Sequence, residues 1–269
     1  MKKIFCFTLV LILAFTAGAY AEKVGTFRKS SNVVDNFQEA IIAGIVAKDF
    51  VFDDTPVKAY DSITLMQLAL NNGEIDSFTT PDFVGEYFLR TNPDYNIRAF
   101  FLGKNPIALA LGFLEEKKEL RDKFNKVIEE MEAEGKIGLL ARDFISGPKA
   151  QNPDAVEFAK FDGAETINIA VTGDMPPLDY VDAAGRPAGF NTAILSEIGK
   201  RLKMNINLVN VETGARAIAL KSGRVDVVFW FQVFTGYENF KDQPDIPEGV
   251  IVSTPYYGWN KVILIGKKK

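Results

Sequence analysis

The sequence contains no histidine, and its only cysteine, Cys6, lies close to the N-terminus. The absence of histidine excludes Ser-His-Asp and Cys-His catalysis. Together with the lack of further cysteine, it removes the usual ligand sets for zinc, copper and haem. No intrachain disulfide can form, although an exported protein would meet a compartment that allows one. Catalysis would have to rest on carboxylates, Lys, Tyr or Ser. These absences favour a binding role, and we expect no cofactor and no bound metal.

Long apolar runs are also scarce: the one that occurs covers residues 4–15 and follows two lysines. The small-x-small triplet "AYA" at residues 19–21 comes next, so the pattern predicts a cleaved secretory signal peptide over residues 1–21. An N-terminal anchor helix is the alternative, but the run is shorter than the roughly 20 residues that span a bilayer. Cys6 lies inside the run rather than at the cleavage point, so we expect no lipid anchor. The prediction is a soluble protein exported to the periplasm.

Neither sign of charge dominates, with 31 Lys and Arg against 35 Asp and Glu and a net charge of −4. The basic residues form no patch apart from the three lysines at 267–269. A nucleic-acid partner is therefore not expected, because phosphate binding needs clustered positive charge. The chain is long enough for one or two domains with substantial cores.

Strand-like and helix-like apolar patterns alternate along the chain. Strands are expected over residues 23–27, 57–60, 75–79, 97–102, 107–111, 167–172, 206–209, 225–231, 250–253 and 261–265. Helices are expected over residues 35–48, 61–72, 81–89, 117–134, 137–144, 192–202 and 215–221. This alternation predicts an α/β protein with parallel sheets and helices on both faces. The periodicity fades over residues 146–165, where prolines and glycines predict a connector.

Five stretches resemble the family 3 extracellular solute-binding proteins, the polar amino acid receptors of ABC importers. "INIAVTGDMPPLDYVDAAGRPAGFNTAILSEIGKRLKMNINLV" (167–209) resembles the opening of the family's first lobe, and "ALKSGRVDVV" (219–228) and "STPYYGWNKVILI" (253–265) continue it. "VKAYDSITLMQLALNNGEIDSFTTPDFVGEYFL" (57–89) is similar to the second lobe. "ALALGFLEEKKELRDKFNKVIEEMEAEGKIGLLARDFI" (108–145) is similar to the C-terminal helices. The resemblance implies a two-lobed, type II periplasmic-binding-protein-like fold in which each lobe is a mostly parallel sheet flanked by helices.

The order of these stretches differs from the family, in which the first lobe begins the chain and the second is inserted. The expected order here is the second lobe over 22–97, a hinge strand and C-terminal-type helices packing on the first lobe over 98–145, the connector over 146–165 and the first lobe over 166–269. This order predicts a circular permutation with one covalent crossing near residues 97–106, which is permitted because domain termini tend to lie at the surface. The alternative is two partial copies that complete themselves in a dimer.

The resemblance implies a ligand site between the lobes, at the C-terminal ends of the strands. Candidate ligand-binding residues on the first lobe are Asp174, Met175, Pro177, Leu178, Tyr180, Phe229, Trp230, Phe231 and Thr235. Candidates on the other lobe are Ser30, Ser31, Thr79, Thr80 and Asp82. A carboxylate would suit a helix N-terminus at Ser30 and Ser31, and an ammonium would suit Asp82 or Asp174. Ordinary helix capping explains the two serines and Asp82 equally well.

Two departures from the family pattern concern the ligand. The family's carboxylate-clamping Arg follows a Thr by three residues, and here Thr235 is followed by Glu238 in "FTGYENF". The family's ligand-binding Asp in the second lobe falls on Pro81, one residue before Asp82. The standard amino acid clamp is thus not expected, and the ligand could be less anionic, or more aromatic or cationic.

Three consecutive aromatic residues, Phe229, Trp230 and Phe231, end an apolar strand. They could stack on a planar or cationic ligand, or fill the core on both faces of a buried strand. Strand alternation sends Trp230 to the face opposite its two neighbours. We therefore expect either Trp230 or Phe231 at the cleft.

The leading functional hypothesis is a monomeric, non-enzymatic receptor that delivers a small-molecule ligand to a membrane ABC permease. An enzyme on the same fold, such as a dehydratase-like protein, would need a cleft carboxyl with a raised pKa, from Asp82, Asp174 or Glu238. A third possibility is a sensor that presents its closed lobes to a partner in trans.

Overall fold

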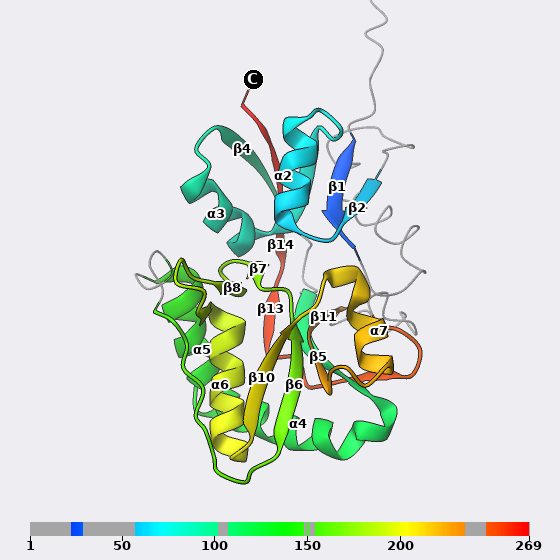
Figure 1. The fold of residues 1–269 in the computed structure, drawn as a ribbon. Coiled ribbons are helices and arrows are strands. Elements are labelled where there is room, and N and C mark those ends of the chain that lie inside the picture. The colour runs from blue at the N-terminus through cyan, green and yellow to red at the C-terminus, as the bar shows by residue number, and fades with distance from the viewer. Residues whose placement is uncertain are drawn as a thin grey trace, which may run out of the picture.

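The protein folds into two α/β lobes, one above the other in Figure 1. The computed structural model describes residues 23–28, 57–101, 107–147, 150, 154–234 and 246–268. The predicted signal peptide and the helix expected over 35–48 lie outside the described residues. Within the described part of the chain, none of the helices combines the length and apolarity needed to cross a bilayer.

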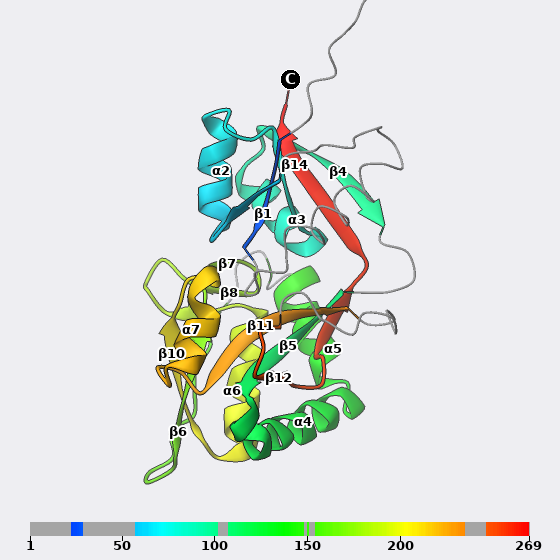
Figure 2. The same ribbon diagram turned by 90° about the vertical axis from the view of Figure 1, so that its right-hand side faces the viewer.

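The upper lobe is built on a five-stranded sheet of order β2-β1-β3-β14-β4. Its elements are β1 (Val24–Phe27), β2 (Val57–Tyr60), α2 (Ile63–Asn71), β3 (Ser77–Pro81), α3 (Asp82–Thr91), β4 (Tyr95–Phe101) and β14 (Lys261–Lys267). Helix α2 begins where the sequence predicted, because the Ser62 hydroxyl accepts a hydrogen bond from the Leu65 N–H at 3.1 Å and so caps an otherwise unpaired donor. Helices α2 and α3 pack on this sheet (Figure 2).

The lower lobe contains a second sheet of order β10-β6-β11-β5-β12, with β13 also paired to β5, and a small sheet β7-β8-β9. Its strands are β5 (Ile107–Leu114), β6 (Thr166–Val171), β7 (Asp174–Met175), β8 (Asp179–Val181), β9 (Pro187–Ala188), β10 (Asn205–Asn210), β11 (Val227–Phe234), β12 (Val250–Val252) and β13 (Tyr257–Trp259). Its helices are α4 (Lys118–Ala133), α5 (Lys136–Ala141), α6 (Phe190–Leu202) and α7 (Arg216–Lys221). Two separate groups of buried residues, one including Phe124 and Phe190 and the other Leu220 and Phe231, show that helices cover both faces of the sheet.

Helix α4 shows how the sequence specifies these elements. Phe124, Val127, Ile128 and Met131 recur at helical spacing and are all buried, so they form the one apolar face by which the helix packs on the core. Gly135 follows with a φ of +69°, a conformation that glycine adopts at little cost and that ends the helix.

Two predictions about the sheets need correction. The sheets are mixed rather than mostly parallel, because β14 runs antiparallel to β3 and β4, and β5 runs antiparallel to β11, β12 and β13. The predicted first lobe, 166–269, in fact ends at β13, because β14 belongs to the upper sheet. Ile263, Leu264 and Ile265 are buried, as expected for a strand with neighbours on both sides.

Between the described strands, the chain consequently passes from one lobe to the other twice, not once. One crossing runs between β4 and β5, and the other between β13 and β14. The crossings lie side by side, since Trp259 is paired with Ile107 in the lower sheet and Lys261 with Phe101 in the upper sheet. Connections that leave and enter the two sheets at adjacent points are typical of a hinge between lobes.

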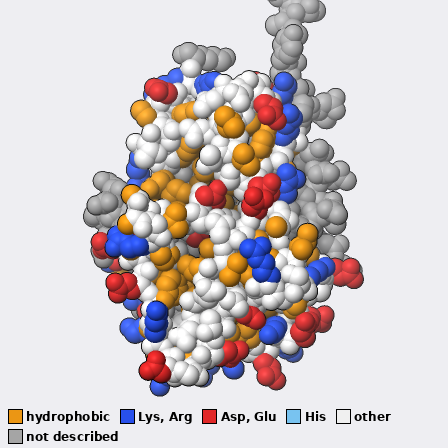
Figure 3. Space-filling model, in the orientation of Figure 1, with side chains coloured by type: hydrophobic (Ala, Val, Ile, Leu, Met, Phe, Trp, Pro, Cys, Tyr) orange, Lys and Arg blue, Asp and Glu red, His pale blue; other side chains and the backbone are white. Residues whose placement is uncertain are grey.

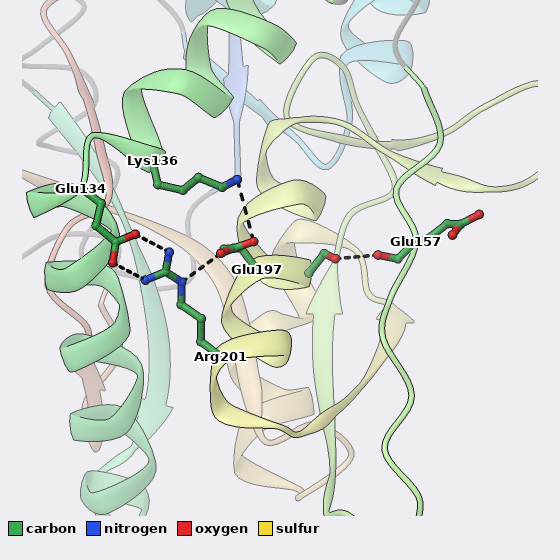
Figure 4. A network of polar contacts seen from close by, with 6 residues as sticks. Glu134, Lys136, Glu157, Glu197 and Arg201 are labelled. Atoms are coloured by element: carbon green, nitrogen blue, oxygen red, sulfur yellow. Dashed lines mark hydrogen bonds and ion pairs between the residues drawn. The ribbon is translucent and has the colours of Figure 1, made fainter.

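The described part of the predicted connector runs along α6 without forming a helix or strand from 154 to 165. The Ser196 hydroxyl donates to the Glu157 carbonyl at 2.6 Å, and the Val156 N–H donates to the Pro187 carbonyl at 2.8 Å. Beside it, Arg201 of α6 pairs with Glu197 and, through both guanidinium NH2 groups, with Glu134 at the end of α4 (Figure 4). These contacts tie α4, α6 and the connector together on the lower lobe.

Candidate functional site between the lobes

Side chains of the two lobes meet along a boundary with two chemically different sides. The α3 side consists of Phe83 and Tyr87 above and Tyr180, Tyr257 and Trp259 below. The Asp61 side consists of Phe27, Arg28 and Asp61 above and Thr213, Gly214 and Trp230 below. Figure 3 shows apolar side chains gathered at the left of this boundary and acidic side chains near its middle.

The α3 side is aromatic and lies at the hinge. The Phe83 ring is 5.5 Å from the ring of Tyr257 and 5.7 Å from that of Trp259, both edge-on, an arrangement favoured by the ring quadrupoles. Tyr87, one turn further along α3, lies 6.2 Å from Tyr180. The predicted ligand residue Asp82 lies here too, 3.9 Å from the Lys261 ammonium. Burial raises the pKa of Asp82, although hydrogen bonding from the Phe83 N–H and the charge of Lys261 oppose this.

The Asp61 side is polar and directional. The Asp61 carboxylate accepts hydrogen bonds from Arg28 Nε at 2.9 Å, within the upper lobe, and from the Gly214 N–H at 3.1 Å, across the boundary. The Thr213 hydroxyl donates to the Asp61 backbone carbonyl at 3.0 Å. A Cβ at Gly214 would lie 2.6 Å from Arg28 Cδ and 2.9 Å from Asp61 Oδ1, so a larger residue here would have to displace these two side chains.

Trp230 is the predicted aromatic residue that reaches the other lobe. Its ring lies 6.4 Å from the Phe27 ring at the end of β1. The residue is 2% exposed, and its indole Nε1 has no hydrogen-bond partner among the described residues. Phe229 instead packs in the core beside Tyr256, with ring centroids 5.5 Å apart.

The expected alternation of these aromatics is wrong at one step. Trp230 has a φ of +52°, and the register of β11 against β5 shifts between Val228 and Phe231. This bulge places Trp230 and Phe231 around one cation: the Arg216 guanidinium lies 4.5 Å from the first ring and 5.0 Å from the second. A bulge redirects side chains because it inserts one extra residue into the strand, which interrupts the alternation of side chains between the two faces.

Asp174 is the predicted carboxylate with the most perturbed environment. It lies in β7, at the end of the lower lobe that faces the upper lobe (Figure 1), and is partly buried. Burial raises its pKa to about 6, and the negative charges of Asp179 and Glu212 contribute to the increase. A positive charge close to such a carboxyl would stabilise its ionised form and lower its pKa again.

The other candidates on the lower lobe support its own fold. Met175, Pro177 and Leu178 are buried. The carbonyls of Pro177 and Leu178 accept hydrogen bonds from the N–H groups of Phe190 and Asn191, so they satisfy the first donors of α6.

On the upper lobe, the hydroxyl of Thr80 donates to the Pro81 carbonyl at 2.8 Å, and that of Thr79 to the Gly25 carbonyl at 3.5 Å. Ser30, Ser31, Thr235 and Glu238 lie outside the described residues. The predicted site is therefore brought together in part: Asp174, Tyr180 and Trp230 reach the boundary region, and Asp82 reaches the hinge.

Sequence reasoning missed several functional candidates. Asp61 was assigned only to a helix start, and Thr213 and Gly214 were assigned to no element. Asp179 is fully buried and accepts hydrogen bonds from Thr172, Gly173 and Asn191 at 2.5–3.1 Å. Burial raises its pKa, while these hydrogen bonds lower it. The available signal was a carboxylate that directly follows the apolar residues 175–178, five residues after Asp174.

One pocket of about 300 Å³ lies within the lower lobe rather than between the lobes. Phe158, Ile206 and Leu208 form much of its wall, and its only charged lining residue is Asp179. Because that carboxylate is already engaged by the protein, the pocket offers apolar contact and no free charge. We do not place a polar solute there.

Two α/β lobes joined by adjacent crossings, and meeting along an aromatic and polar boundary, define the class of two-lobed binding proteins. The family model for bacterial extracellular solute-binding proteins, family 3, matches residues 167–268. Over this range, which is less than half of the chain, the match agrees with the resemblance found in the sequence.

Several solved structures are similar to the chain. The zinc-bound ligand-binding component of an ABC-type import system from Staphylococcus aureus is 10% identical, with a TM-score of 0.44 over 91% of this chain and 65% of that one. The methionine-binding protein MetQ is 13% identical, with a TM-score of 0.41 over 92% and 83%. The aliphatic sulphonate-binding protein SsuA from Escherichia coli is 11% identical, with a TM-score of 0.36 over 91% and 64%. The chain thus spans about two thirds of the length of two of these proteins. At TM-scores below 0.5 the similarities carry no argument about this protein. No curated protein matches the sequence.

Proposed function

We propose that the protein is a periplasmic receptor that closes its two lobes on a small polar solute, an amino acid or related compound, and delivers it to an ABC permease. It acts as a monomer and without catalysis, after removal of a signal peptide over residues 1–21. The family match supports solute binding, and the adjacent crossings supply the hinge that closure needs.

The observation that carries the proposal is the indole of Trp230. It is buried at the boundary, and its N–H donor has no acceptor among the described residues. A buried donor without an acceptor costs about 1–3 kcal/mol. A solute that supplies an oxygen acceptor would recover this energy, and Asp174 would favour a solute that also carries a positive charge.

A thermal-shift screen of amino acids, polyamines and small organic acids tests the proposal. A true ligand stabilises the protein by about 2.7 kcal/mol at a hundredfold excess over its Kd. The hit should bind more weakly to Trp230→Phe, which keeps an aromatic ring but removes the donor. If no solute in the three classes shifts the melting temperature, the proposal is wrong.

A carboxylate-dependent enzyme is the second candidate, because a pKa of about 6 suits Asp174 to general acid-base chemistry. Mass spectrometry of each hit after incubation separates the two. A receptor returns the solute unchanged, whereas an enzyme yields product that disappears in Asp174→Asn.

We also propose that the order of segments arose by circular permutation. Val24 of β1 and Gly266 of β14 are both paired with Ser77 of β3. Neighbouring strands lie about 4.8 Å apart, so these two positions are separated by only about 10 Å and a short loop could join them.

A chain reopened within the 154–165 segment, with residue 268 linked to residue 23, should fold and bind the same solutes. Failure of this rearranged chain to fold, while the original folds, would contradict the permutation.

A further inference from the structure

We infer that Arg216 is a positioning residue that couples closure of the lobes to the conformation of Trp230. Only the expected effect of Arg216 on solute affinity rests on the proposed function. The geometric coupling can be measured without a solute.

Arg216 joins two separate points of the boundary. It begins α7 and is 1% exposed. Its Nε donates to the Thr213 carbonyl at 3.0 Å, and one of its terminal NH2 groups donates to the Trp230 carbonyl. One buried side chain thus holds the turn that contacts Asp61 and the strand that contacts Phe27.

Trp230 needs such support because its backbone is strained. A φ of +52° is rare for a large aromatic residue, and strained conformations of this kind persist only where the surroundings hold them. Arg216 makes two contacts with Trp230. Its guanidinium donates a hydrogen bond to the Trp230 carbonyl and lies 4.5 Å from the centre of the Trp230 ring.

The upper lobe completes the arrangement. Asp61 receives hydrogen bonds from both Thr213 and Gly214, which lie just before α7. When the lobes separate, these bonds break, and the turn that orients Arg216 loses its support. Closure therefore fixes Arg216, and Arg216 fixes Trp230.

Lysine cannot replace arginine in this position. A planar guanidinium donates in two directions and stacks on a ring at the same time, whereas an ammonium is a compact point charge. The conservative change Arg216→Lys therefore removes the coupling while it keeps the charge.

The sequence provides specific probes for the test. Trp230 and Trp259 are the two tryptophans, so a Trp259→Phe background leaves Trp230 as the sole reporter. The single cysteine lies in the predicted signal peptide, so Leu68→Cys on α2 and Ile218→Cys on α7, which are 55% and 71% exposed, accept spin labels specifically.

In this background we would compare Arg216→Lys, Asp61→Ala, the double variant and the control Arg201→Lys, which lies in the ion pairs of Figure 4 away from the boundary. Asp61→Ala should lower the ratio of closed to open molecules, read from the distribution of label distances, about fivefold, as expected for one lost hydrogen bond. It should also raise acrylamide quenching of Trp230. Arg216→Lys should reproduce both effects, and the double variant should add little to either single change. The control should leave both readouts unchanged.

Additive effects would overturn the inference, as would lobes that open in Asp61→Ala with no change in Trp230 quenching. If Arg216→Lys does not fold, Gly214→Ala tests the same coupling from the edge of the boundary. Solute binding with unchanged Trp230 quenching in these variants refutes the coupling and leaves the proposed function intact. Coupled quenching in a protein that binds no screened solute refutes the proposed function and leaves the coupling intact.

Discussion

The two sides of the lobe boundary differ in the forces that hold them. On the α3 side, Phe83 inserts among aromatic rings beside the crossings. On the Asp61 side, the contacts are hydrogen bonds to one carboxylate and its backbone carbonyl. Aromatic packing tolerates small rotations, whereas hydrogen bonds weaken steeply with angle. The α3 side can therefore persist as a pivot during lobe movement, while the hydrogen bonds of the Asp61 side form only when the lobes are closed.

Removing the pivot should have the largest effect. Phe83 is 6% exposed, so we expect Phe83→Ala to destabilise the protein by about 3–5 kcal/mol through the lost contacts and the cavity left behind. Urea unfolding measures this change. Leu68→Ala, at a position 55% exposed on the same lobe, is the control and should change stability by less than about 1 kcal/mol. Equal effects at the two positions would refute the pivot.

A change on the Asp61 side should alter the arrangement of the lobes more than the free energy of unfolding. Gly214→Ala places a Cβ against Asp61 and Arg28, so we expect it to disfavour the closed form by about 1–3 kcal/mol. Small-angle scattering should show a larger radius of gyration, while the urea midpoint changes little. Gly138→Ala is the matched control, because a Cβ at Gly138 meets no atom within 4 Å. An unchanged scattering curve for Gly214→Ala would show that the contact does not govern closure.

The carboxyl of Asp174 should make stability depend on pH. Its folded pKa of about 6 lies above the ordinary value of 3.8, so its ionisation destabilises the folded protein increasingly as the pH rises from about 4 to 6. Asp174→Asn should therefore be more stable than the parent at pH 7, by about 1 kcal/mol after allowance for its partial exposure. This difference should vanish near pH 4.

Asp182 provides a control of opposite sign. Hydrogen bonds from the N–H of Arg186 and other groups lower its pKa, so Asp182→Asn should lose stability at pH 7 and regain parity in acid. Urea unfolding at pH 4, 5, 6 and 7 measures Asp174→Asn, and further measurements at pH 2 and 3 measure the return of Asp182→Asn to parity, because the pKa of Asp182 is lowered from 3.8. A constant difference across this range at Asp174 would contradict the perturbed pKa.

The smallest effect is expected away from the boundary. Arg201 pairs with Glu134 and Glu197, which raises the arginine pKa, but Glu134 is largely exposed. Exposed ion pairs contribute little, so Arg201→Met should lower Tm by about 2 °C or less at low salt, and less still at 1 M salt. Calorimetry at the two salt concentrations measures this, and a salt-independent loss would point to packing instead.

Most of the elements could be predicted because their signals are local. The buried face of α4 and the Ser62 cap of α2 can each be recognised from a few neighbouring residues of the sequence. The two- and three-residue strands β7 to β9 are too short to show a period. The apolar run of β14 indicated a strand but not its sheet, because partners are chosen by tertiary packing.

The site could be predicted less well for the same reason. Asp174 and Trp230, which lie at the boundary, were proposed because they stand near the ends of predicted strands, a position common to ligand sites of this class of fold. Asp61 was missed because its partners, Thr213 and Gly214, lie far away in sequence. The bulge at Trp230 was missed because no glycine or proline marks it, and Arg216, which contacts its ring, was assigned only to a helix.

The position of β14 has a consequence for biosynthesis. Strands β3 and β4 are not adjacent in the sheet; they are bridged by β14, which the ribosome makes only after the entire lower lobe. The upper sheet, although encoded first, must wait as an incomplete half while the rest of the polypeptide emerges. For the exported receptor proposed above, this order would keep the leading half of the chain unfolded enough to pass a narrow translocation channel until synthesis is almost finished.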